Sequence, residues 1–289
     1  MNNVLISSTL VIFASIFFVT NDAIINYLSP QGIQFYHFIF YGTPVYLSFL
    51  IYLILKGQFI EKIQATNYTI PIIRGLIFAP MPFITFISLK NISLPEFTTL
   101  NMSSPIFAGL LSIFVLKEKM NSLLFISLFS GFLGVFFVIQ PGFENFSPFY
   151  LLVLLGSCLI TFTTFIVNKY NNVTSPIGYF VWSGIVIYPL SIVLFILDPV
   201  LVDFITLILI VISSILINIA LLCMTFAFQR SQKFYASIFC LVYIQILWSV
   251  LIGFFIFNEY LNLFAVIGAF FIILSGLFSI PAQYKQINE

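Results

Sequence analysis

The chain has 289 residues, of which 61% are hydrophobic and only 7% are charged, and its mean hydropathy is +1.16. A water-soluble protein of this size needs far more polar side chains to cover its surface, so the composition excludes a water-soluble globular protein. The formal net charge of +1 gives no support for nucleic-acid binding, which requires a concentrated basic surface.

Ten apolar segments follow one another along the chain, each close to the ~20 residues that a helix needs to cross the hydrocarbon core of a bilayer. The connections between them are short and leave no room for a domain outside the membrane. The first segment has no Lys or Arg ahead of it and no small-residue cleavage pattern after it, so we expect a membrane helix there rather than a secretory signal. The predicted spans are residues 4–27, 33–55, 69–89, 96–116, 123–140, 148–168, 176–197, 204–228, 234–257 and 263–281.

The basic residues predict the orientation of these spans. If the N-terminus is cytoplasmic, eight Lys and Arg residues fall on the inner side and one, Lys90, falls outside. The inner set is Lys56, Lys62, Lys117, Lys119, Lys169, Arg230, Lys233 and Lys285. Under the positive-inside rule, this asymmetry predicts a protein of the plasma (inner) membrane with both termini in the cytoplasm.

The two halves of the chain repeat a weak pattern. In each half a Ser-Pro pair, Ser29-Pro30 or Ser175-Pro176, precedes a Pro-containing span, and a later apolar run ends in a Glu, Glu118 or Glu259. Pro44 precedes Glu118 by 74 residues, and Pro189 precedes Glu259 by 70 residues. This spacing predicts two five-helix repeats, residues 1–145 and 146–289. Because five is odd, they enter the membrane from opposite sides, as the inverted repeats of transporters do.

The same residues resemble a known family, the drug/metabolite transporter superfamily, in its ten-helix branch. The resemblance covers essentially the whole chain. In the first half it is carried by Arg74-Gly75-Leu76 through Phe86, Leu94-Pro95, Pro105, Leu116-Lys117-Glu118, Gly131, Gly134 and Pro141-Gly142. In the second half it is carried by Tyr243, Gln245, Leu247-Trp248, Gly253, Glu259, Gly268 and Ser275-Gly276.

Within that superfamily, Asn21-Asp22 and Asn26-Tyr27-Leu28 are similar to the S-adenosylmethionine uptake branch. The chain departs from the pattern at His37, which stands where such proteins usually place an Arg in the second helix. The resemblance implies two inverted five-helix units and the movement of small organic solutes by alternating access. Substrates across the superfamily include amino acids, nucleotide derivatives, sugars and quaternary amines, and fold kinship does not choose among them.

Charged residues at membrane depth are candidates for a site, because burying a charge in lipid is costly. Asp22, in the last turns of the first span, is either an anionic contact for a cationic or zwitterionic solute or a hydrogen-bonded residue at the outer interface. His37 lies at a similar depth, where it either pairs with Asp22 or serves as a packing element. Arg74 either contacts an anionic group from the inner side or extends to the cytoplasmic headgroups.

Aromatic and polar side chains complete the predicted substrate contacts. Trp182, Tyr243 and Trp248 offer faces that attract a quaternary ammonium or sulfonium group, with Gln245 between the last two. Asn101 and its neighbours Ser103 and Ser104, together with Asn218, either line the same cavity or make ordinary interhelical hydrogen bonds. Glu118 and Glu259 occupy matching positions in the two halves and are predicted to have a shared structural role such as helix capping.

The sequence therefore predicts an all-α secondary transporter or exchanger for a small organic metabolite, for example a cationic or zwitterionic solute such as S-adenosylmethionine or a quaternary amine. The alternatives are an amino-acid or metabolite exporter, or a non-transporting scaffold. We expect no enzyme, because a single His offers no catalytic set, and no cofactor or metal, because the three cysteines lack CxxC spacing. The expected partners are the solute and membrane lipids, not nucleic acid, and the protein is expected to be a monomer or homodimer.

Overall fold

A computed structural model describes the chain except for residues 1, 118–120, 140–146, 232–233, 259–262 and 289. Glu118, Lys119, Lys233 and Glu259, together with the predicted boundary between the repeats at residue 145, lie outside the described residues. The main helices of the described part are α1 (Asn2–Leu28), α2 (Phe35–Leu55), α3 (Phe59–Ile63), α4 (Thr69–Phe78), α5 (Met81–Leu89), α6 (Leu94–Asn101), α7 (Ser104–Leu111), α8 (Ser122–Ile139), α9 (Pro148–Lys169), α10 (Pro176–Leu197), α11 (Phe204–Ser231), α12 (Tyr235–Cys240), α13 (Ile244–Phe257) and α14 (Leu263–Asn288).

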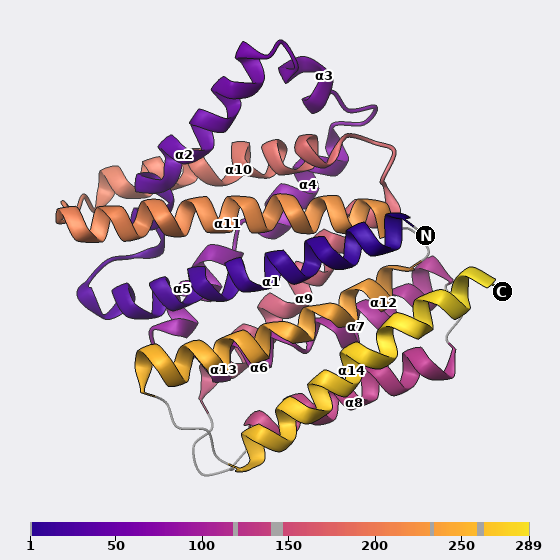
Figure 1. Ribbon diagram of the computed structural model, residues 1–289. Coiled ribbons are helices and arrows are strands. Elements are labelled where there is room, and N and C mark those ends of the chain that lie inside the picture. The colour runs from indigo at the N-terminus through magenta and orange to yellow at the C-terminus, as the bar shows by residue number, and fades with distance from the viewer. Residues whose placement is uncertain (1, 118–120, 140–146, 232–233, 259–262, 289) are drawn as a thin grey trace.

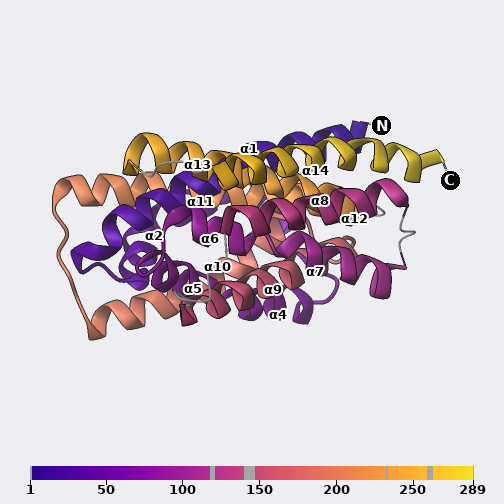
Figure 2. The same cartoon turned by 90° about the horizontal axis from the view of Figure 1, so that it is seen from below.

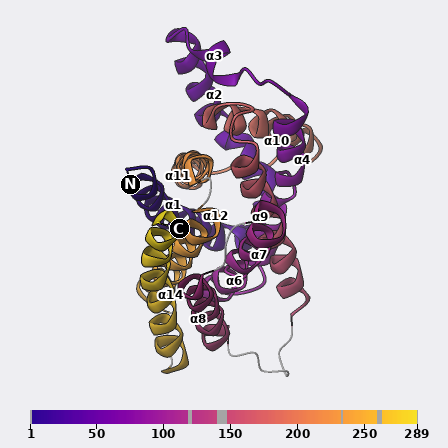
Figure 3. The same cartoon turned by 90° about the vertical axis from the view of Figure 1, so that its right-hand side faces the viewer.

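The predicted all-α architecture is confirmed: the described residues contain no strand, only one isolated backbone bridge between Ala65 and Thr174. Eight helical segments of the described residues are long and apolar enough to cross a membrane, and they coincide with eight of the ten predicted spans. The fifth and tenth predicted spans correspond to the apolar helices α8 and α14, which pack along each other at one edge of the bundle (Figure 3).

Three predicted spans are interrupted helices. The third consists of α4 and α5, which meet at Pro80, where the missing backbone N–H removes a helical hydrogen bond. The fourth consists of α6 and α7, separated just ahead of Pro105 and followed by a π-helical turn, Ser112–Leu116. The ninth consists of α12 and α13, joined by a 3-10 turn, Leu241–Tyr243, in which no proline explains the break.

Serine caps start several of the helices. Ser93 Oγ accepts a hydrogen bond from the Glu96 N–H, and the Glu96 carboxylate accepts one from the Ser93 N–H at 2.9 Å, a reciprocal capping box. Ser175 Oγ accepts a hydrogen bond from the Gly178 N–H at 3.0 Å, with Pro176 at the first helical position. This cap explains why the seventh predicted span and helix α10 both begin at Pro176.

The long helices run roughly parallel or antiparallel and form one bundle (Figures 1 and 2). α1 packs along α11, α10 packs against α2 and α4, and α9 contacts α4, α5, α6, α7 and α11. Helices from both halves of the chain are thus interleaved around a common interior. α1 begins and α14 ends at the same end of the bundle (Figure 1).

Candidate functional site

A cavity of about 230 Å³ lies inside the bundle. Its lining comes from α1, α2 and α4–α7 of the first half and from α9–α13 of the second. Ligand sites for small organic molecules typically lie in such concave, mostly apolar spaces with a few polar groups. Asp22 and Arg74 are the only Asp, Glu, Lys or Arg residues among the described residues that line the cavity.

Asp22 is a buried carboxylate at one end of this cavity. Asp22 is only 8% exposed to solvent, and its Oδ1 accepts a hydrogen bond from Asn21 Nδ2 at 3.1 Å. Ser213 of α11 donates to Asn21 Oδ1 at 2.7 Å, so the Asn21 amide links Asp22 on α1 to the second half. The only salt bridge between described residues joins Lys62 and Glu61 at the surface, so the structure gives Asp22 no cationic partner.

Arg74 is a buried guanidinium held by α10. Its Nη1 donates to the Tyr179 carbonyl oxygen at 2.9 Å and to Ser183 Oγ at 2.6 Å, and the guanidinium carbon lies 5.8 Å from the centroid of the Tyr179 ring. Its Nε has no hydrogen-bond partner in the structure. The alternative that Arg74 extends to the cytoplasmic headgroups is therefore wrong, because the side chain is only 5% exposed and lines the cavity.

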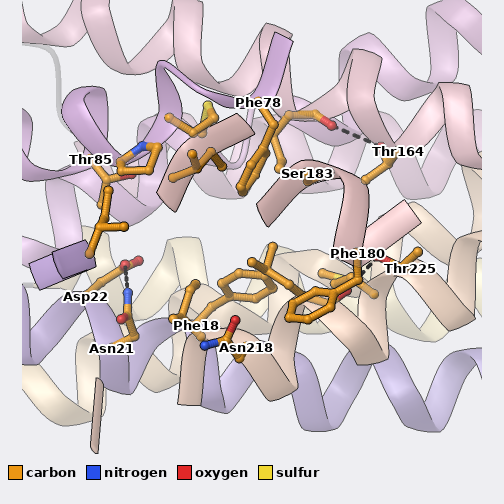
Figure 4. Close-up of a pocket in the computed structure, with 18 of the residues that line it drawn as sticks. Phe18, Asn21, Asp22, Phe78, Thr85, Thr164, Phe180, Ser183, Asn218 and Thr225 are labelled. Carbon is orange, nitrogen blue, oxygen red and sulfur yellow. Dashed lines mark hydrogen bonds between the residues drawn. The ribbon is translucent and has the colours of Figure 1, made fainter. Parts of the chain in front are cut away.

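Close helix packing places Arg74 in this position. A Cβ on Gly75 would lie 3.2 Å from Ser183 Cα and 3.3 Å from the Trp182 carbonyl oxygen, so any larger residue would require α4 and α10 to move apart by a few tenths of an ångström. Figure 4 shows Asp22 and Asn21 across the open space from Ser183, the residue that accepts the Arg74 hydrogen bond. The cavity thus presents an acidic group and a basic group on different walls.

Other predicted polar residues also reach the cavity. Asn101, Ser104, Asn218 and Gln245 all line it. Asn218 Nδ2 donates to the Ser214 carbonyl oxygen at 2.7 Å, and its Oδ1 accepts from the Tyr188 hydroxyl at 3.4 Å. These residues therefore line the cavity, and Asn218 in addition makes a hydrogen bond between α11 and α10.

His37 lies away from the cavity, and its predicted pairing with Asp22 is wrong. Its Nδ1 accepts a hydrogen bond from the Gln34 N–H at 2.9 Å, which makes it the third-position member of the capping box that starts α2. Its Nε2 lies 2.8 Å from the Asp198 carbonyl oxygen in the α10–α11 connection. Both ring nitrogens are thus used to hold backbone at one end of the bundle.

The three predicted aromatic contacts do not line the cavity. Trp182 Nε1 donates to the Ile63 carbonyl oxygen at 3.0 Å, and Trp248 Nε1 donates to Ser15 Oγ at 3.0 Å. Tyr243 is fully buried against α8, with its ring in the space that a Cβ on Gly131 would occupy. The shared helical face of Tyr243 and Trp248 points to other helices, while Gln245 points to the cavity.

The cavity is instead lined by aromatic residues that were not predicted from the sequence. Phe18, Phe78 and Phe180 line it (Figure 4). Tyr46 and Tyr188 also line it, and their rings stack with centroids 4.3 Å apart. The abundance of Phe in the chain hides these positions in the sequence.

The face of α11 that lines the cavity could have been recognised from the spacing of its residues in the sequence. Ser214, Asn218, Leu221 and Thr225 are spaced four, three and four residues apart, which places them on one helix face, and all four line the cavity. Three of these four residues are polar within a predominantly apolar span, and this pattern indicates the face of α11 that looks toward the cavity.

Comparison with known proteins agrees with this architecture. Residues 2–140 match the EamA-like transporter family. Proteins named S-adenosylmethionine uptake transporter from Rickettsia bellii and Rickettsia prowazekii are 26% and 24% identical to the chain, over 93% of its length and 91% and 90% of theirs. An uncharacterized transporter of Helicobacter pylori is 25% identical over 100% of this chain and 99% of its own.

A solved crystal structure, 15% identical in sequence, superposes with a TM-score of 0.71 over 96% of both chains and thus shares the fold. The apolar spans, the central cavity and these similarities lead to one conclusion: the chain is a membrane transporter whose residues 2–140 match an EamA-like domain of the drug/metabolite transporter superfamily.

Proposed function

We propose that this transporter moves a small zwitterionic metabolite, with S-adenosylmethionine as the first candidate, by alternating access through the central cavity. The observation that carries the proposal is the presence of Asp22 and Arg74 in one cavity without an ionic partner. S-adenosylmethionine has a carboxylate, an ammonium and a sulfonium group, so it offers both complementary charges. The names of the Rickettsia relatives support the same substrate.

The energetics favour a solute that supplies both counter-charges. An unpaired charge removed from water costs several kcal/mol, and a buried ion pair recovers that cost only when its hydrogen bonds are also satisfied. A carboxylate at the unpartnered Nε of Arg74 and a cationic group at Asp22 would meet both requirements. A singly charged solute would leave one of these residues uncompensated, and a neutral solute would leave both.

A free amino acid is the second candidate, and the volume of the cavity favours it. About 230 Å³ lies below the ~300 Å³ at which sites for drug-sized ligands begin. A solute with a nucleoside moiety requires the cavity to widen, which the opening step of alternating access would supply. An amino acid would fit without that change.

The proposed mechanism uses two inverted five-helix units that together cross the membrane ten times. The fourth and ninth spans, which correspond in the repeat, are both interrupted, and both are followed by residues in the left-handed conformation, Lys117 (φ 55°) and Asn258 (φ 56°). Non-glycine residues rarely adopt this conformation, so its recurrence at matching positions supports a duplicated unit. The charge asymmetry of the sequence supports cytoplasmic termini.

Two sets of hydrogen bonds join the two halves of the chain, and we propose them as the gates of the cavity. At one end, Thr66 N–H donates to the Val173 carbonyl oxygen at 2.9 Å, and Ser175 Oγ donates to the Lys62 carbonyl oxygen at 2.6 Å. At the other end, Tyr41 donates to the Val200 carbonyl oxygen at 2.7 Å, beside the bond between the Tyr36 hydroxyl and the Asp198 carboxylate. Alternating access would break one set at a time.

Counterflow in proteoliposomes tests the proposal. Purified protein is reconstituted with unlabelled S-adenosylmethionine inside, and entry of labelled S-adenosylmethionine is followed with external competitors. We expect S-adenosylhomocysteine, which retains the carboxylate and ammonium, to compete, and decarboxylated S-adenosylmethionine and choline, which lack the carboxylate, to compete poorly. Equal competition by choline would contradict the proposal.

Two further arms of the experiment separate the alternatives. Exchange of methionine without exchange of S-adenosylmethionine would favour the amino-acid candidate. Uptake measured with and without a pH gradient decides between proton coupling and exchange, since only a proton-coupled carrier accelerates in response to the gradient.

A further inference from the structure

A second hollow lies on the outside of the bundle between α2 and α11, with Phe180 of α10 as its floor; we call it the α2–α11 groove. Ile215 and Ile219 on its rim are 42% and 40% exposed, so it opens to the surroundings of the bundle. Its lining residues are Val45, Tyr46, Ser48, Phe49, Tyr52, Phe180, Ile215, Asn218, Ile219 and Leu222.

The course of α2 creates this groove. Pro44 has no N–H to donate to the carbonyl of Phe40, which weakens the helix at that point. Beyond it, the C-terminal part of α2 diverges from α11 toward α3 (Figure 1). The separation leaves apolar side chains of both helices facing a common space within the membrane-spanning region.

Most of the polar side chains that line the groove already make hydrogen bonds within the protein. Ser48 Oγ donates to the Val45 carbonyl oxygen at 2.8 Å. Asn218 uses its Nδ2 and Oδ1 in bonds to Ser214 and Tyr188, and Tyr46 donates to the Val181 carbonyl oxygen at 2.8 Å. A polar solute would find little beyond the Tyr52 hydroxyl to hydrogen-bond with, whereas a hydrocarbon chain would bury the remaining apolar surface.

A cation lies at the end of the groove. Lys56 Nζ is 5.9 Å from the centroid of the Tyr52 ring, and Tyr52 lines the groove. Lys56 is exposed and makes no ion pair with any described residue. A basic residue beside an apolar groove complements a ligand with a hydrocarbon chain and an anionic head.

We propose that the α2–α11 groove is a binding site for an anionic phospholipid, with an acyl chain between α2 and α11 and the phosphate beside Lys56. Tyr46, Phe180 and Asn218 line both this groove and the central cavity. The bound chain therefore packs on the outer side of the wall that faces the transported solute. Lipid composition is expected to act on transport through that wall.

Brominated lipids test the site, because bromine quenches tryptophan fluorescence at close range. In a Trp182→Phe, Trp248→Phe background, Leu222→Trp places a reporter in the groove. Phe255→Trp, at a position 74% exposed on α13, provides a matched lipid-facing reference. Each protein is titrated in lipid nanodiscs with brominated phosphatidylglycerol or brominated phosphatidylcholine.

We expect half-maximal quenching of the Leu222→Trp reporter at about fivefold lower content of brominated phosphatidylglycerol than of brominated phosphatidylcholine. One lysine beside an anionic head group contributes ~1 kcal/mol, which corresponds to that ratio. Lys56→Gln should abolish that preference, while Lys169→Gln, a change at another exposed lysine, should preserve it. The Phe255→Trp reporter should show no preference. Tyr52→Trp replaces Leu222→Trp if the latter does not fold.

Equal quenching by the two lipids at the groove reporter would overturn the proposal. So would a reporter that neither lipid quenches, which is the outcome expected if a second copy of this chain covers the groove. Because the readout is lipid contact and not transport, it stands or falls independently of the proposed substrate.

Discussion

The Asp22→Asn substitution tests whether the Asp22 carboxylate binds the solute or only stabilises the fold. Asparagine has nearly the same shape as aspartate, and its side-chain oxygen can still accept the 3.1 Å hydrogen bond from Asn21 Nδ2. The substitution removes only the negative charge. In the protein without solute, this relieves the cost of burying an unpaired carboxylate, so we expect the free energy of unfolding to stay unchanged or to rise.

The effect on solute binding should be opposite and large. A buried cation that loses its only anionic partner loses about 3 kcal/mol at the low end of the range for broken buried pairs, which corresponds to roughly 100-fold in Kd. Exposed ion pairs are worth no more than ~1 kcal/mol. The matched control is therefore Glu61→Gln, which removes an exposed carboxylate paired with Lys62 at the surface.

Thermal unfolding of the purified protein across a series of S-adenosylmethionine concentrations measures both quantities at once. Ligand that binds the folded state raises its apparent stability in proportion to the logarithm of concentration over Kd. We expect the control to shift as the wild type does, and Asp22→Asn to require about 100-fold more solute for the same shift. Unchanged affinity, or a loss of stability in the solute-free protein, would refute the assignment of Asp22 to the solute.

Three further substitutions test other parts of the structure. Arg74→Lys keeps the charge but loses the planar fork of donors, so we expect affinity for carboxylate-bearing solutes to fall about tenfold while choline competition is unaffected, as measured in counterflow. His37→Ala removes the α2 capping bond and the bond to the Asp198 carbonyl oxygen, so it should lower stability by ~1 kcal/mol in thermal unfolding and leave the KM for uptake unchanged; a raised KM would place His37 in the site after all. Gly131→Ala puts a methyl group 2.3 Å from the buried Tyr243 ring, so about 1–3 kcal/mol of stability should be lost by overpacking, and a neutral result would show that the ring is free to move.

Properties that depend on local chemistry could be predicted from the sequence alone. The all-helical membrane architecture follows from apolar runs of the right length, and eight of the predicted spans coincide with helices because lipid leaves a chain few other ways to satisfy its backbone. Asp22 and Arg74 could be chosen as site candidates because charge in an apolar span is costly enough to require a function or a partner. Asn101 and Gln245 followed from the same reasoning about polar groups.

Which helix face meets which neighbour was decided only by the tertiary structure. Tyr243, Gln245 and Trp248 lie within six residues of one another, yet only Gln245 faces the cavity, because the other two pack on helices distant in sequence. His37 matches Asp22 in predicted depth but bonds to the α10–α11 connection, whose position no local pattern specifies. Depth in the membrane is encoded along the chain, whereas rotation about each helix axis depends on packing between helices, and that packing placed Asp22 and Arg74 in one cavity.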